Sequence, residues 1–170
     1  MSNQPKQIGK SFAFIFWGLL LVLFYWFFED KLMEQINPNR SPESYQVGSE
    51  QVLVLKRNRY GHYVTSGFIN GKSVVFMLDT GATKVAVPSE VAQRVGLSSG
   101  APIRVSTANG TATAYQTRIG ALRIGELEMY DVSASIIPGM KGEQILLGMS
   151  VLKQVNFSQV GDELTIKLTR

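Results

Sequence analysis

The chain has 170 residues, which is enough for one compact domain and an accessory segment but not for two full domains. Its net charge is +4, and the positive residues are scattered, so nucleic acid is not expected as a partner. There is no Cys and a single His, His62, so no Cys/His zinc site can form, and no metal or other cofactor is expected. We expect His62 to be a strand or surface residue rather than a catalytic one.

An uncharged apolar run covers residues 11–28 and predicts a transmembrane helix. As a helix this run is about 27 Å long, near the thickness of the hydrocarbon core of a bilayer. Lys6 and Lys10 precede it and Glu29-Asp30 follow it, so residues 1–10 are predicted to be cytoplasmic. No Ala-x-Ala site follows, which favours an uncleaved single-pass anchor in the inner membrane, with the rest of the chain on the periplasmic side.

Residues 29–50 are predicted to be a stalk between the anchor and the folded domain. From residue 31 to residue 50 the segment is polar, carries Pro38 and Pro42, and shows no sustained period of 2 or 3.6. A flexible chain of that length has a root-mean-square span of about 25 Å. The folded domain is therefore expected to occupy residues 51–170.

From Gln51 onward the pattern is one of short β-strands punctuated by turn residues. A helix is predicted from Pro88 to Val95, ended by Gly96, and Asn70-Gly71 and Asn109-Gly110 each indicate a hairpin. This spacing predicts an all-β fold, a small barrel or sandwich. The expected strands are Val52–Lys56, Gly61–Ile69, Ser73–Leu78, Val85–Val87, Ile103–Thr107, Thr111–Gln116, Arg118–Ile124, Leu127–Ile137, Gln144–Leu147, Val155–Ser158 and Glu163–Leu168.

The triplet Asp79-Thr80-Gly81 directly follows the apolar run Ser73–Leu78. By itself the triplet is weak evidence, because a strand-ending turn in which Asp caps backbone amides has the same composition. In the context Phe-Met-Leu-Asp-Thr-Gly-Ala-Thr, it resembles the active-site strand of the clan AA retropepsin-like aspartic proteases. Two further segments fit in order, since Ser106–Thr111 resembles the flap hairpin and Ile145–Leu152 resembles the segment that passes beneath the catalytic loop and enters a short helix.

This resemblance covers roughly residues 50–170 and implies a small closed barrel with one or two short helices after the transmembrane helix. It implies catalytic roles for Asp79, Thr80 and Gly81, and substrate contacts from Ala82 and Thr83 in the extended loop. It also implies substrate contacts from the flap tip, Ala108, Asn109 and Gly110. Tyr115 is open to either a substrate contact or cross-strand packing.

Aspartic proteases need two carboxylates that share one proton, so that one activates water and the other protonates the scissile carbonyl. Beyond Asp30 the chain has only Asp79, Asp131 and Asp162, and the last two lie outside an Asp-[Ser/Thr]-Gly context. The pair is therefore expected to come from two copies of Asp79 in a homodimer.

The expected function is that of a membrane-anchored aspartic endopeptidase acting on polypeptides near the membrane, with its own stalk as one candidate substrate. An alternative is a catalytically silent binding or dimerisation module of the same fold, tethered to the membrane. A third reading is a generic β-domain with an incidental Asp-Thr-Gly.

Overall fold

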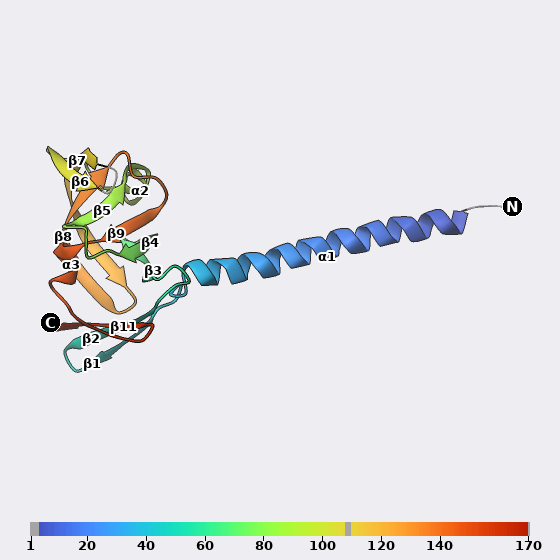
Figure 1. Cartoon of the computed structure of the whole chain (residues 1–170), viewed down its shortest axis with the longest axis horizontal. Helices are drawn as coiled ribbons and strands as arrows, with labels where there is room; N and C mark the ends of the chain where they lie inside the picture. The colour runs from blue at the N-terminus through green and yellow to red at the C-terminus, as the bar shows by residue number, and fades with distance from the viewer. Residues whose placement is uncertain (1–3, 108–109, 170) are drawn as a thin grey trace. The chain divides into compact units, whose positions relative to one another are not determined.

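The computed structural model describes residues 4–107 and 110–169. It divides the chain into two compact units, Met1–Gln35 and Ile36–Arg170, which are described separately (Figure 1). The second unit contains all the strands of the described chain.

The first unit is built from the helix α1, which runs from Gln4 to Ile36. Its segment Lys10–Ile36 has a mean hydropathy of 2.1 over its most apolar window and is long enough to cross a membrane. The helix extends eight residues beyond the predicted span because Glu29–Gln35 consists mostly of good helix formers. It ends before Asn37-Pro38, since a residue that precedes proline is disfavoured in the helical region.

A closed barrel forms the larger part of the second unit. Its seven strands are β3 (Val64–Ile69), β4 (Lys72–Leu78), β5 (Val85–Pro88), β6 (Pro102–Thr107), β7 (Gly110–Ile124), β8 (Leu127–Ile137) and β9 (Gln144–Leu147). They pair in the order β3-β4-β9-β5-β8-β7-β6, and β3 also pairs with β7. That additional pairing closes the ring and leaves β6 as an outer strand, so the predicted all-β closed barrel is confirmed.

A second, antiparallel sheet joins strands from the two ends of this unit. Its strands are β1 (Glu43–Val47), β2 (Glu50–Lys56), β10 (Asn156–Val160) and β11 (Glu163–Thr169), in the order β1-β2-β11-β10. Figure 1 shows the labelled strands of this sheet at one end of the unit and the β6–β7 hairpin at the other. Both sheets contribute to one hydrophobic core, which includes Leu53, Leu55, Phe76, Val87, Ile119, Leu122, Ile145, Leu147, Leu164 and Ile166.

Two short helices complete the unit, as predicted. The helix α2 runs from Ser89 to Val95 and ends at Gly96, whose φ of 74° is the left-handed conformation that glycine adopts without strain. The helix α3 runs from Met149 to Leu152 and follows β9 through Gly148.

Both predicted hairpins have paired strands. Asn70 and Gly71 have φ values of 50° and 78°, as a type I′ turn between β3 and β4 requires. The pairs Thr107↔Gly110 and Ser106↔Thr111 show that β6 and β7 form the second hairpin, while its tip, residues 108–109, lies outside the described residues. The predicted break at Thr117 was wrong, because β7 continues through it to Ile124.

The prediction of an irregular stalk over residues 29–50 was wrong. The compact unit begins at Ile36 rather than at Gln51. Asn39 is 3% exposed, and its side-chain amide donates to the carbonyl oxygens of Lys56 (2.8 Å) and Val64 (2.7 Å). Its side-chain oxygen accepts from the Lys56 amide at 2.7 Å. These bonds tie the segment to the barrel, and β1 then pairs along β2. The two-residue Gly48-Ser49 turn is the sequence signal that marks β1.

Candidate active site

Asp79 is held at the point where the barrel strand β4 ends. β4 lies between β3 and β9, and its last residue, Leu78, is in parallel register with Leu147 of β9. The Asp79 amide then donates to the Leu147 carbonyl oxygen at 3.1 Å. The pairing of the apolar strand β4 with β9 therefore also fixes the position of the Asp79 backbone at the end of the strand.

The loop that follows is folded back on Asp79. The Gly81 amide donates to Oδ1 of Asp79 at 2.8 Å, and the Ala82 amide donates to the Asp79 carbonyl oxygen at 3.2 Å. Asp79 is half-buried, while Thr80 and Gly81 are exposed. The first bond orients the carboxylate, so a side-chain oxygen is presented at the surface in a fixed direction.

The segment after β9 forms the floor of this loop, as predicted from the sequence. A Cβ on Gly148 would lie 2.3 Å from the carbonyl oxygen of Lys84, so no larger residue fits there without a shift. The Met149 amide donates to the Ala82 carbonyl oxygen at 2.8 Å, and the Ser150 amide donates to that of Thr83 at 3.0 Å. The structure thus brings residues 79–83, all five predicted loop residues, into one supported turn.

The other two aspartates of the second unit lie outside this loop, in ion pairs on the surface. Asp131 bonds Arg118, and Asp162 bonds Arg57. The hydrogen bond from Arg118, helped by its charge, holds the pKa of Asp131 below its ordinary value although partial desolvation opposes it. The same hydrogen bond and charge raise the pKa of Arg118.

The remaining predicted residues have simpler positions. Ala108 and Asn109 lie outside the described residues, and Gly110 begins β7. Tyr115 packs against the hydrophobic core, which supports its packing role. His62 is exposed, in a turn where its amide donates to Asn58, so the expectation of a surface residue is confirmed. Among the described residues, no three His, Asp or Glu side chains gather into a group suited to a metal ion.

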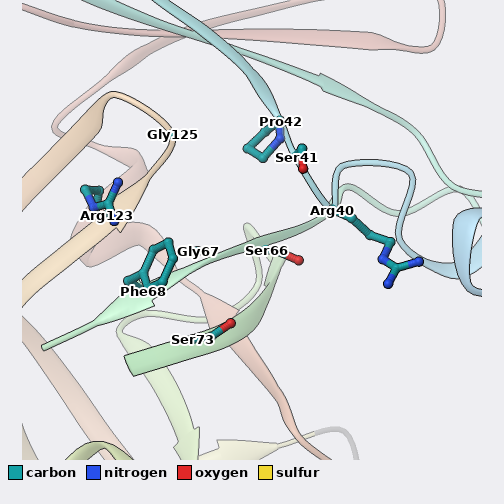
Figure 2. A pocket seen from close by; sticks show the side chains of 9 residues that line it. All are labelled: Arg40, Ser41, Pro42, Ser66, Gly67, Phe68, Ser73, Arg123 and Gly125. Carbon is teal, nitrogen blue, oxygen red and sulfur yellow. The ribbon is translucent and has the colours of Figure 1, made fainter. Parts of the chain in front are cut away.

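A cavity of about 520 Å³ lies apart from the Asp79 loop, and sequence reasoning did not single it out. None of residues 79–83 lines it. Figure 2 shows Arg123 beside Phe68, with the guanidinium carbon 4.4 Å from the ring centroid, while the side chain of Arg40 is directed away from them. The lining residues are Arg40, Ser41, Pro42, Ser66, Gly67, Phe68, Ser73, Arg123 and Gly125.

The profile of a protein family described as gag-polyprotein putative aspartyl protease matches residues 65–154, more than half of the chain. The chain belongs to this family of retropepsin-like aspartic proteases. The matched stretch contains the Asp79 loop, the β6–β7 hairpin and Gly148.

The chain is similar to three known proteins. The chain is 30% identical over 144 residues to a Sinorhizobium sp. protein described as an uncharacterized protein in the cobV 5′ region, covering 82% of this chain and 62% of that protein. A crystal structure of a retropepsin-like aspartic protease from Rickettsia conorii is 26% identical with a TM-score of 0.57, covering 75% of this chain and 95% of that one. The EIAV protease complexed with the inhibitor HBY-793 is 16% identical with a TM-score of 0.48, covering 58% and 92%.

Proposed function

We propose that the protein is a membrane-anchored aspartic endopeptidase that works as a homodimer. The observation that carries the proposal is the Asp79 carboxylate, fixed by the Gly81 amide and supported from below by Gly148, in a chain of the aspartyl protease family. In a generic β-domain with an incidental Asp-Thr-Gly, such a supported carboxylate would not be expected.

In the proposed reaction the two Asp79 carboxylates of the dimer share one proton. The ionised carboxylate removes a proton from a bound water as that water attacks the scissile carbonyl, and the protonated one donates to the carbonyl oxygen. Thr80 steadies the pair, and Gly81 lets the backbone approach the carboxylate. Ala82 and Thr83 contact the substrate from below, and the hairpin tip at Ala108, Asn109 and Gly110 covers it.

Support for a dimer comes from the count of motifs and from an unprotected sheet edge. Each chain has one Asp-Thr-Gly, so a carboxylate pair needs a second copy. The edge strand β10 carries no charged residue, and Phe157 and Val160 are 50% and 80% exposed. Such an edge is a ready template for pairing with another chain.

Anchoring through α1 limits the enzyme to polypeptides at or near the membrane. The helix is apolar on all sides over residues 11–28, and Phe14 and Trp26 are 77% and 68% exposed within their unit, as lipid-facing side chains would be. Lys6 and Lys10 before the apolar run and Glu29-Asp30 after it favour a cytoplasmic N-terminus and a periplasmic catalytic unit.

The test is hydrolysis of a peptide library by the full chain in lipid nanodiscs, between pH 4 and pH 7. We expect the wild type to cleave peptides and Asp79→Asn to be inactive with its fold retained. Asp131→Asn is the matched control, because Asp131 lies in a surface ion pair, and it should cleave like the wild type. Equal cleavage by the Asp79→Asn protein would refute the mechanism, and a wild type that binds peptides without cleaving them would support a silent module.

A further inference from the structure

We infer that Ser150 is a positioning residue for Asp79, acting through the loop that joins β4 to β5. The inference rests on the proposed function, because its consequence is for peptide hydrolysis. Ser150 belongs to the first turn of α3, within the segment Ile145–Leu152 that passes beneath the loop, but its side chain was given no role there from the sequence.

The loop from Asp79 to Val85 is tied at both ends. At its start the Asp79 amide donates to the Leu147 carbonyl oxygen at 3.1 Å. At its far end the Val85 amide donates to Oγ of Ser150 at 3.2 Å. The Ser150 amide also donates to the Thr83 carbonyl oxygen at 3.0 Å, so this one residue holds the loop at two points.

The Ser150 hydroxyl connects the loop to the barrel wall. While it accepts from Val85, it donates to the carbonyl oxygen of Ser133 in β8 at 3.0 Å. β5 and β8 are parallel neighbours, with Val85 opposite Ala134, so the hydroxyl bridges the first residue of β5 to the strand beside it. Both bonds are partly buried, where an unmatched amide or carbonyl is costly.

A serine at the start of a helix often caps that helix with its side chain, but Ser150 does not cap α3. The N-cap position is Gly148, and the helix has no side-chain cap hydrogen bond. The hydroxyl is directed to two strands outside the helix instead. Its contribution is therefore to the position of the loop and not to the stability of α3.

In the proposed dimer a displaced loop shifts both carboxylates at once, because each copy contributes one. Reaction rates are sensitive to such displacements, since a shift of about 1 Å can cost about a hundredfold. Ser150 contacts the loop through Thr83 and Val85 and has no proposed contact with substrate of its own. The loop also carries Ala82 and Thr83, so a displaced loop weakens substrate contacts as well. Loss of the hydroxyl should therefore lower kcat and raise KM by a smaller factor.

The experiment compares Ser150→Ala, Ser150→Thr and the matched control Ser135→Ala in the full chain in nanodiscs. Ser135 is 4% exposed, and its Oγ has no hydrogen-bond partner among the residues that the structure describes, so its removal breaks no bond. Peptide hydrolysis gives kcat and KM, and amide hydrogen exchange reports on Val85. We expect Ser150→Ala to lower kcat by roughly tenfold to a hundredfold, with a smaller change in KM and faster exchange at Val85. Ser150→Thr keeps the hydroxyl and should restore both.

Two results would overturn the inference. One is a Ser150→Ala protein whose kcat and Val85 exchange match those of Ser135→Ala. The other is a loss of activity in Ser150→Ala that Ser150→Thr fails to restore while Val85 exchange stays slow. A wild type without peptidase activity refutes the proposed function instead, and Val85 exchange then decides alone whether Ser150 holds the loop.

Discussion

A Cβ atom on Gly148 would lie 2.5 Å from the carbonyl oxygen of Ala82, closer than real Cβ contacts come. The two residues are 66 positions apart in the sequence, yet one forms the floor on which the loop containing the other rests. Backbone lies on both sides of this contact, so neither side can move away as a flexible side chain would. The glycine is therefore a steric requirement of the Asp79 loop.

Gly148→Ala should destabilise the protein by about 1–3 kcal/mol, because the added methyl group overpacks a site bounded by backbone. It should also reduce peptidase activity by displacing the loop. Denaturant unfolding of the full chain in detergent measures the change in the free energy of unfolding. Gly139→Ala is the control, since a Cβ on Gly139 would meet no atom within 4 Å. Equal stability of the two variants would contradict the steric argument.

Asn39→Asp should destabilise the second unit by about 1–3 kcal/mol or more, because the new side chain has the same shape but lacks the amide donor. The carbonyl oxygens of Lys56 and Val64 would each lose a bond. Thermal unfolding at pH 7 measures the change. Gln93→Glu on the exposed face of α2 makes the same amide-to-carboxylate change and should be nearly neutral. A destabilisation by Gln93→Glu as large as that by Asn39→Asp would show that the bonds of Asn39 do not matter.

Val160→Lys should weaken the proposed dimer, because a charge on the edge strand β10 opposes strand pairing with a second copy. Peptidase activity should fall together with the dimer fraction, which native mass spectrometry in detergent measures. Val47→Lys makes the same change on β1, the opposite edge of the sheet, where Val47 is 59% exposed. A dimer that Val47→Lys disrupts and Val160→Lys leaves intact would place the interface elsewhere.

The Arg118–Asp131 pair should make a small, pH-dependent contribution to stability. Because hydrogen bonding to Arg118 lowers the pKa of Asp131, this contribution is present above the ordinary aspartate pKa and is lost as the pH falls through the folded-state value. The melting temperatures of the wild type and Asp131→Asn should therefore differ slightly at pH 7 and converge below about pH 4. Asn tolerates the φ of 53° at this position. A difference that grows on acidification would contradict the assignment.

Local signals in the sequence predict most of the barrel. The apolar run before Asp79 predicts β4, Pro88 and Gly96 bound α2, and Asn70-Gly71 predicts its turn. Prediction fails between residues 29 and 50. The helix formers of Glu29–Gln35 and the Gly48-Ser49 turn are local signals there, but the other determinants are not local. β1 has a polar composition and forms because β2 offers it an edge, and Asn39 is fixed by partners 17 and 25 positions away.

The candidate site divides in the same way. Residues 79–83 are found from one contiguous motif, because the loop and its carboxylate are neighbours in sequence. The role of Ser150 could not be predicted from the sequence, because nothing local distinguishes this serine from others in short helices. Its role depends on the bonds of its hydroxyl to Val85 and Ser133, which only the fold brings close. Long-range bonds of this kind, from a side chain to distant backbone groups, are set by the packing of the barrel and produce no periodic pattern in the sequence.

The asparagine bonds at the start of the second unit bear on self-cleavage. The carbonyl oxygen of Ile36 accepts from Asn58, and Asn37 and Asn39 are buried. A peptidase binds an extended, accessible segment, so residues 36–39 would have to leave the folded unit before they could be cut. Within the region expected from the sequence to be a stalk, these residues are therefore poor substrates for the enzyme itself.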